Sequence, residues 1–342
     1  MMDLRTTLGP LTLKNPVIAA SSEATIDAIG IRACLDAGAA AVVAKSVNES
    51  PAAARQLNIA DYALIGGEGN ETPWPARTGD ETLLCRSGLA QANLDDWLSM
   101  LDESQQYAQT LGAHVVGSIT VAEAEPAAEI ARRMAEVVPA VELNVGAPHG
   151  REAHAVKQIT GAEMVAHYTR TVRAAVNVPL IVKLPAQTDS PLALATAARE
   201  AGADIITMIG RFNGFWPNLG TGEPLLGSWG AVGGAGVLPI SLYWVSKTHA
   251  VAPSAPLIGT NGARTGADVA RFLLSGASAV ELATSVLLKG PGVLTDCIGE
   301  LDETLATAGY TSARNAIGSA VRKARAYADI PPREKPYRPW EE

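Results

Sequence analysis

"DAGAAAVVAK" (36–45), "EAGADIITM" (200–208) and "SGASAVELA" (275–283) repeat one pattern: a helix end, a turn around a glycine and an apolar strand. Working outward from these copies, short apolar runs alternate with longer amphipathic segments of helical period along the whole chain. The runs are residues 15–20, 40–46, 114–120, 140–146, 179–185, 204–210, 256–262 and 279–285. They turn polar mainly at their C-terminal ends, as parallel strands covered on both faces do. Eight such strands alternating with helices predict an α/β fold, a (β/α)8 TIM barrel, with a doubly wound open sheet as the alternative.

The composition argues against several classes of protein. The chain of 342 residues has a formal net charge of −8, which disfavours general binding to nucleic acid or to anionic membranes. Its three cysteines, Cys34, Cys85 and Cys297, contain no C-x-x-C pair, so we expect neither a disulfide framework nor a zinc or iron–sulfur site. No His/Asp/Glu spacing indicates a metal site. Because no apolar run could span a bilayer or serve as a signal peptide, we expect a cytoplasmic protein.

Two long inserts interrupt the regular spacing. Residues 47–92 and 211–239 each follow a strand, so in a barrel they would lie on the C-terminal face. We expect both inserts to cover a pocket there. Residues 310–342 are predicted to add a short basic helix over 313–329 and an extended Pro-rich end. No segment has the character of a linker, so residues 1–342 are expected to form one domain.

Polar residues stand at the ends of three predicted strands. Lys45, Asn144 and Lys183 each follow an apolar run, so a barrel would bring all three to one rim. A single lysine there is as often a surface residue that buries only its stem. Two lysines and an amide on one rim favour a shared anionic ligand instead. A lysine beside a flavin ring stabilises the negative charge of its reduced form, so the pair fits flavin chemistry.

The last two predicted strands are followed by loops of small residues. "GTNG" (259–262) and "ATS" (283–285) occupy the positions where barrels of this kind bind phosphate through backbone N–H groups. The glycine-rich "GAVGGAG" (230–236) would allow close approach to the same ligand. The sequence therefore predicts a ligand with a phosphate group.

Several segments together resemble the dihydroorotate dehydrogenase family of FMN-binding barrels over nearly the whole chain. They are "LGPLTLKNPVIAASS" (8–22), "AKSV" (44–47), "ELNVGAPHG" (142–150), "VKLPAQTD" (182–189), "GGAGVLPISL" (233–242) and the stretch 256–285. The PHG ending is closest to the flavin domain of dihydropyrimidine dehydrogenases, and "GRFNGFWPNL" (210–219) is similar to a divergent dihydroorotate dehydrogenase-like group. The resemblance implies FMN across the barrel mouth. Its ring would be lined by Ala20, Ser21, Lys45, Asn144 and Lys183, and its ribityl phosphate would lie near Gly234, Asn261, Gly262, Ala283 and Thr284.

The departures from the family pattern concern the substrate. The catalytic Cys or Ser of the family is replaced by Ala147, which can move no proton. Three of the four substrate-binding asparagines are also replaced, by Cys85, His149 and Ile209. A polar substrate loses binding energy when its hydrogen-bond partners are removed, so dihydroorotate is not the expected substrate.

The candidate catalytic residues are therefore His149, Cys85 and Lys45. His149 would act as acid or base near neutral pH, or would only hydrogen-bond a ligand carbonyl. Cys85 would donate a proton, or would be an inert buried thiol. Arg86 and Arg211 are candidates for binding a carboxylate, with plain surface charge as the alternative.

These features predict an FMN-dependent oxidoreductase acting on a CH–CH group. It would transfer a hydride between flavin and a small cyclic or conjugated substrate other than dihydroorotate. Three alternatives stay open: an atypical dihydroorotate or dihydropyrimidine dehydrogenase with another base, a catalytically idle flavin-binding protein, and a barrel that binds a phosphate ligand without flavin. The expected partners are a small-molecule substrate, a separate electron donor or acceptor and a second copy in a homodimer, with no nucleic acid, membrane or metal.

Overall fold

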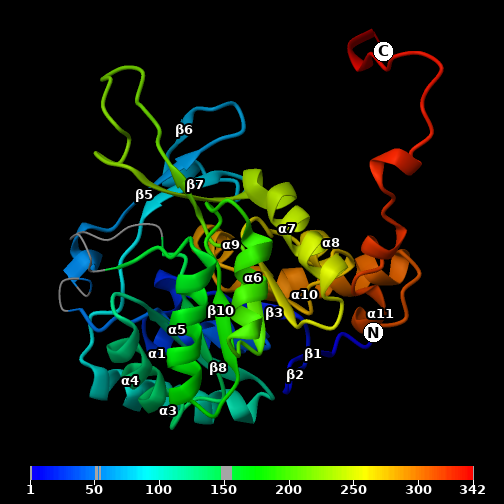
Figure 1. Ribbon diagram of the computed structural model, residues 1–342. Coiled ribbons are helices and arrows are strands. Elements are labelled where there is room, and N and C mark those ends of the chain that lie inside the picture. Colours follow the sequence, from blue (N-terminus) through cyan, green and yellow to red (C-terminus); the bar gives the residue numbers. More distant parts are fainter. Residues whose placement is uncertain (1, 51–52, 54, 148–155, 342) are drawn as a thin grey trace.

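The structure is a computed structural model that describes residues 2–50, 53, 55–147 and 156–341. At its centre is a closed barrel of eight parallel strands (Figure 1). The strands are β3 (Val17–Ala19), β4 (Ala41–Val43), β8 (His114–Thr120), β9 (Val141–Asn144), β10 (Leu180–Lys183), β11 (Ile205–Met208), β14 (Leu257–Thr260) and β15 (Ala279–Leu282). Each lies within one of the eight apolar runs, and β15 pairs with β3 to close the ring. The predicted barrel is confirmed, and the open sheet is wrong.

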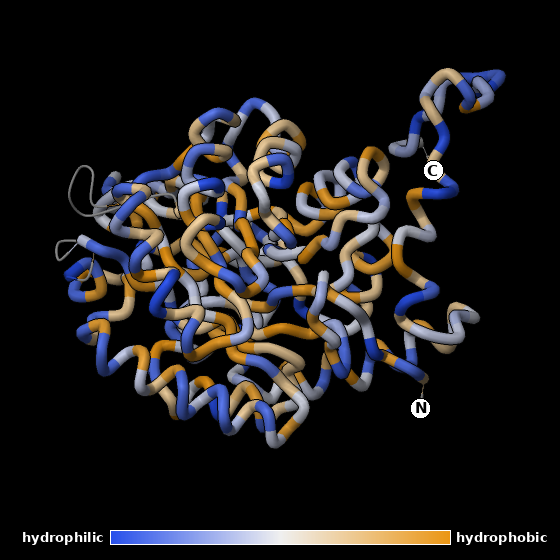
Figure 2. Tube along the Cα trace, turned by 60° about the horizontal axis from the view of Figure 1, so that its bottom comes forward, coloured by the Kyte–Doolittle hydropathy of each residue, from blue (hydrophilic) through white to orange (hydrophobic). Residues whose placement is uncertain are grey.

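Helices surround the barrel (Figure 1). They are α1 (Ala28–Asp36), α3 (Leu94–Thr110), α4 (Ala124–Met134), α5 (Ala162–Ala175), α6 (Pro191–Glu200), α7 (Leu238–Val251), α8 (Gly266–Leu274), the short α9 (Thr284–Lys289) and α10 (Gly292–Thr307). Side chains of Asp27, Asn93, Ser190 and Thr265 cap α1, α3, α6 and α8 by accepting a first-turn N–H. Figure 2 shows apolar segments gathered inside the molecule, where the strands pack against the helices.

A hairpin closes the N-terminal end of the barrel. It consists of β1 (Thr6–Leu8) and β2 (Leu11–Leu13), and was not predicted from the sequence. Leu8 and Leu13 are buried with Ile181 and Ile258, which belong to the barrel strands. Because this end is filled with apolar side chains, a ligand site is left to the C-terminal end.

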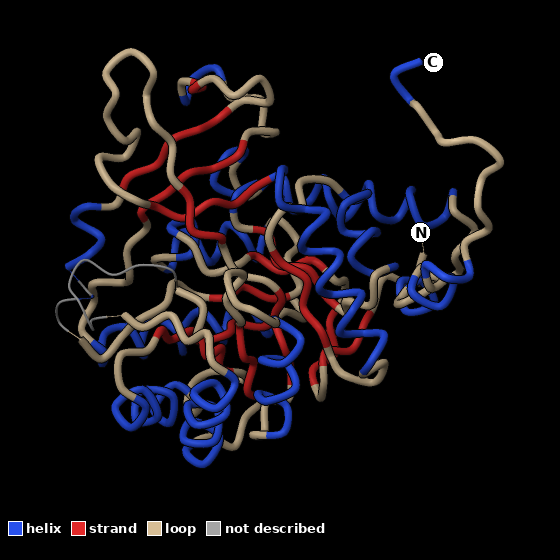
Figure 3. The backbone as a smooth tube through the Cα atoms, turned by 45° about the horizontal axis from the view of Figure 1, so that its top comes forward, coloured by secondary structure: helices blue, strands red, loops and turns tan. Residues whose placement is uncertain are grey.

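The two inserts together build one additional sheet. Residues 47–92 contribute β5 (Asp61–Ile65), β6 (Glu71–Thr72) and β7 (Thr82–Arg86), and residues 211–239 contribute β12 (Phe212–Gly214) and β13 (Gly230–Gly234). The order is β12-β13-β7-β5-β6, so β13 pairing with β7 joins the inserts. Figures 1 and 3 show this sheet beyond one end of the barrel. The inserts are thus one structural element and not two independent loops.

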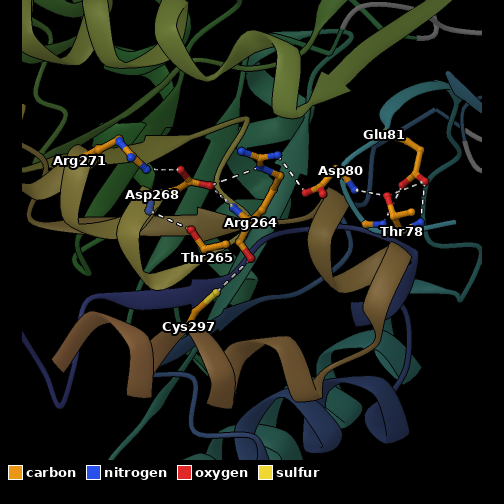
Figure 4. A network of polar contacts seen from close by, with 9 residues as sticks. Thr78, Asp80, Glu81, Arg264, Thr265, Asp268, Arg271 and Cys297 are labelled. Carbon is orange, nitrogen blue, oxygen red and sulfur yellow. Dashed lines mark hydrogen bonds and ion pairs between the residues drawn. The ribbon is translucent and has the colours of Figure 1, made fainter. Parts of the chain in front are cut away.

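An ion-pair network anchors the first insert to the barrel (Figure 4). Arg264, in the loop after β14, lies 3.0 Å from Asp80 of the insert and 3.4 Å from Asp268 of α8. Asp268 also pairs with Arg271 at 2.8 Å. Next to Asp80, Glu81 accepts the backbone N–H groups of residues 78 and 79. The start of β7 is therefore held beside the loop that follows β14.

The C-terminal segment differs from the prediction. The single helix expected over 313–329 is replaced by the one-turn α11 (Ala313–Ala316) and by short 3₁₀ turns. Gly318 interrupts it with a φ of +69°, which a right-handed helix cannot contain. The last residues run away from the body of the molecule (Figure 1). Within the described ranges, no helix is both long and apolar enough to cross a membrane.

Candidate active site

The C-terminal end of the barrel holds a cavity of about 870 Å³, measured to its open mouth and here called the main cavity. Most residues predicted from the sequence line it, namely Ala20, Ser21, Lys45, Cys85, Asn144, Lys183, Asn261, Gly262, Ala283 and Thr284. Tyr62, Leu83 and Ser87 of the first insert and Arg211 of the second also contribute. Both inserts therefore reach the site.

A second hollow of about 420 Å³, the side cavity, adjoins the first. The two share Ser21, Lys45, Ser87, Asn144, Ala147 and Arg211. Ala147, which stands where the family has its base, therefore lies at the junction of the two spaces. His149, the other candidate in this loop, lies outside the described residues.

Lys45 is buried and forms an ion pair inside the main cavity. Its Nζ lies 2.8 Å from Oε1 of Glu23, in the segment after β3, and the same oxygen accepts the N–H of Gly88 at 3.3 Å. Burial lowers the pKa of Lys45, against the effect of Glu23. Burial also acts to raise the pKa of Glu23, but Lys45 outweighs it and the net shift is downward. The ion pair therefore favours the charged form of both groups, against the effect of burial.

Lys183 lies between two carboxyl groups that are completely buried in the barrel. Its Nζ is 2.5 Å from Oε2 of Glu281 and 3.8 Å from Oε2 of Glu142. Burial, together with the neighbouring Glu281, raises the pKa of Glu142 to about 8. Burial acts to lower the pKa of Lys183, but the two carboxyls outweigh it and raise that pKa. The two buried carboxyls thus share one ammonium, and Glu142 is mainly protonated at neutral pH.

The loops after β13, β14 and β15 converge at the other end of the main cavity. Asn261 has a φ of +73°, its side-chain oxygen accepts the N–H of Gly234 at 3.3 Å, and its amide donates to Gly210 O at 2.9 Å. Gly262 has a φ of +112°, and a Cβ there would lie 2.6 Å from the backbone of Leu238. Gly234 itself is next to the lining, with Thr284 beside it. This close packing of small residues is suited to a phosphate group.

Cys85 and Arg211 meet on the side of the main cavity formed by the inserts. Nη1 of Arg211 donates to Cys85 Sγ at 2.8 Å, and Cys85 Sγ donates to Ala231 O at 3.5 Å. Among the described residues, Arg211 forms no ion pair with a carboxylate. Burial, with Glu23 nearby, raises the pKa of Tyr62, whose hydroxyl makes no hydrogen bond of normal geometry within the described chain. A buried hydroxyl beside Glu23 and a guanidinium with further donors suit a polar ligand.

The second arginine predicted as a carboxylate ligand has a structural role. Nε of Arg86 donates to Ile59 O at 2.6 Å, and Nη1 donates to Leu226 O. Arg86 lines neither cavity and instead ties the two inserts together.

Sequence reasoning missed the acidic partners of both lysines. Glu142 and Glu281 stand within "AVELN" and "AVELA", and a charged residue inside a strand covered on both faces was a usable signal. Glu23 and Tyr62 carry no such signal, because their positions depend on how distant segments pack. No group of three metal-ligating side chains occurs in the part of the chain that the structure describes.

Comparison with known proteins gives a consistent result. The family model for dihydroorotate dehydrogenase matches residues 3–305. The catalytic subunit of dihydroorotate dehydrogenase B (NAD(+)) from Bacillus pumilus is 30% identical over 253 residues, which are 73% of this chain and 79% of the relative. The corresponding subunit from Pyrococcus abyssi is 28% identical over 323 residues, 93% and 99% of the two chains. The chain belongs to the dihydroorotate dehydrogenase family.

Proposed function

We propose that this oxidoreductase, whose family acts on a CH–CH group, uses FMN and a small cyclic or conjugated substrate other than dihydroorotate. The observation that carries the proposal is the main cavity, with a buried lysine from each of two barrel strands and a cradle of small residues at its far end. Ala20, Ser21, Lys45, Asn144 and Lys183 would hold the ring, and Gly234, Asn261, Gly262, Ala283 and Thr284 the phosphate. When bound, FMN supplies the hydride acceptor or donor.

The protein's own residues orient the site. Asn144 is fixed because its Oδ1 accepts the N–H of Gly146 at 3.0 Å, which leaves its amide NH2 for the ligand. Gly146 permits this turn, since a Cβ there would lie 2.7 Å from the backbone of Pro185. His149, Cys85 and Lys45 are retained as candidate catalytic groups.

The charges favour a substrate with an anionic group. Around the junction of the cavities, Lys45 and Arg211 contribute two positive charges and Glu23 one negative charge. Arg211 carries donors beyond the one given to Cys85, and a guanidinium binds a carboxylate bidentately. In this proposal the two positive charges bind an anionic group of the substrate, in place of the hydrogen bonds that the family's asparagines would make.

Electrons are proposed to pass to or from a separate protein. The relatives compared above are named as catalytic subunits, which supports a partner that carries electrons. The chain itself is proposed to form a homodimer in the cytoplasm.

FMN is expected to co-purify with the protein and to be released from it by acid. A preparation without visible absorbance, which gains none when FMN is added, would exclude the flavin function and leave a phosphate-binding barrel. Anaerobic mixing of the coloured protein with NADH, dihydropyrimidines and cyclic enones then separates an enzyme from an idle flavin-binding protein. Only an enzyme changes the flavin absorbance with one of them.

Lys45→Ala is expected to make the flavin midpoint potential more negative. The reduced ring carries the negative charge that the ammonium stabilises, so its loss weakens the binding of reduced flavin more than that of oxidised flavin. Lys247→Ala, which removes an exposed lysine on α7, is the matched control and should leave the potential unchanged. An unchanged potential in Lys45→Ala would show that this ammonium is not at the ring.

A further inference from the structure

Three serine hydroxyls connect the two cavities with the interior of the barrel. Ser21 Oγ lies 3.2 Å from Ser46 Oγ, Ser46 Oγ lies 2.9 Å from Ser118 Oγ, and Ser118 Oγ donates to Glu142 Oε1 at 3.0 Å. The four residues belong to β8 and β9 or directly follow β3 and β4, which are neighbours around the barrel. Ser21 lines both cavities, whereas Ser118 and Glu142 have no exposed surface. The chain thus has one open end and one buried end.

The three hydrogen bonds of the chain can all donate in the same direction, from Ser21 toward Glu142. The backbone N–H of Ser46 donates to Ser21 Oγ at 3.1 Å and occupies one of its two lone pairs. The hydroxyl proton of Ser21 is then directed to Ser46, that of Ser46 to Ser118, and that of Ser118 to Glu142. The second lone pair of Ser21 stays available to the cavity.

The buried end is built to gain or lose a proton. Glu142 faces Ser118 from β8, Lys183 from β10 and Glu281 from β15. Two carboxyls share one ammonium, so the second carboxyl is neutral when protonated and uncompensated when ionised. Oε2 of Glu142 and Oε1 of Glu281 have no hydrogen-bond partner within the described chain. A carboxyl in such surroundings has a pKa near the working range of an acid–base catalyst, here about 8.

We propose that Ser21, Ser46 and Ser118 form a proton wire between the substrate and Glu142, and that this wire replaces the side-chain base missing at Ala147. In substrate oxidation, the C–H proton passes to Ser21 Oγ while Ser21 gives its own proton to Ser46. Ser46 in turn protonates Ser118, and Ser118 protonates Glu142 in its ionised form, which prevails above the pKa of about 8, so oxidation should speed up as the pH rises through that value. The accompanying hydride goes to the flavin of the proposed function, on which this inference rests, and substrate reduction reverses every transfer.

The position of the open end supports this assignment. Ser21 and Ala147 both lie at the junction of the cavities, so the wire ends where the family places its base. The other described candidates are engaged: Lys45 is paired with Glu23, and Cys85 donates to Ala231 O.

Infrared spectroscopy of the purified holoprotein tests the wire without a substrate. At pH 7, Glu142 should give a protonated-carboxyl band that is absent in Glu142→Gln and that titrates with a midpoint of about 8. In D2O the band should shift in a fast phase, because cavity water exchanges its proton through the serines. Ser46→Ala cuts the wire without removing a hydrogen bond of Glu142, so the fast phase should be lost while the band stays.

Ser241→Ala is the matched control, because it removes another buried serine hydroxyl, on α7, and should leave the fast phase intact. Unchanged exchange in Ser46→Ala would overturn the wire, as would the absence of a Glu142 band at pH 7. Failure of the flavin function is a different result, because it appears as a colourless protein whatever the exchange rate.

Discussion

Lys183→Met lowers the free energy of unfolding by about 3–5 kcal/mol at neutral pH, the usual cost of removing one member of a buried ion pair. The ammonium contacts Glu281 at 2.5 Å and lies 3.8 Å from Glu142, and neither carboxyl has exposed surface. Without it, Glu142 and Glu281 lose the ammonium that they share. The change is measured as a shift of the urea unfolding midpoint.

The loss in Lys183→Met should depend on pH. The ammonium acts to lower the pKa of Glu142, so its removal moves the folded-state pKa of Glu142 further above the unfolded value of about 4.3. Such a group costs no stability below the unfolded pKa, and stability falls as the pH rises from the unfolded pKa to the folded pKa. The deficit should therefore be smaller at pH 5 than at pH 8.

Lys45→Met is the matched control for this experiment. It removes the other cavity lysine, but its partner Glu23 is 22% exposed and can be hydrated again. A smaller loss with weaker dependence on pH is expected. Equal losses in the two variants would show that Lys183 has no special role in holding the barrel together.

The barrel was predictable because its signal is local. The strands are short, mainly apolar runs that both faces of a parallel sheet can bury, and polar residues at the ends of several of them mark the ligand-binding rim. Lys45, Asn144 and Lys183 reached the main cavity for this reason. The paired loops "GTNG" and "ATS" reached it because small residues after the last two strands leave room for a ligand.

What was missed depends on contacts between distant segments. Cys85 pairs with Ala231 across 146 positions in the chain, and no pattern within either insert reveals that register. The ion pair between Lys45 and Glu23 likewise joins residues that no local pattern connects. The serine chain also forms only in the closed barrel, because Ser21, Ser46 and Ser118 come from different strands or strand ends. The prediction of a basic helix over 313–329 was wrong for a local reason. Gly318 has a positive φ that ends the helix, and this glycine was visible in the sequence.

Dihydroorotate is expected to reduce the flavin of the native protein at a negligible rate. Ala147 and Ile209 both line the main cavity, so the missing base and at least one missing asparagine lie around one ligand site. A side-chain base at position 147 would contribute about 10²–10⁴-fold to the rate, a contribution that the proposed serine wire has to supply instead. Each unsatisfied polar group of the substrate costs a further 1–3 kcal/mol or so. The measurement is anaerobic stopped-flow bleaching of the flavin.

Substitutions at the site separate the effect of the missing base from the effect of the missing asparagines. Ala147→Cys adds a thiol but no amide, so it should recover little activity, and Ala147→Val controls for the larger side chain. Ile209→Asn with Cys85→Asn adds the amides instead. If the serine wire already moves the proton, recognition is the larger deficit, and the amide pair should raise the rate more than the thiol does. Fast bleaching by dihydroorotate in the unmodified protein would contradict this account, because it would mean that the cavity recognises the substrate without those asparagines.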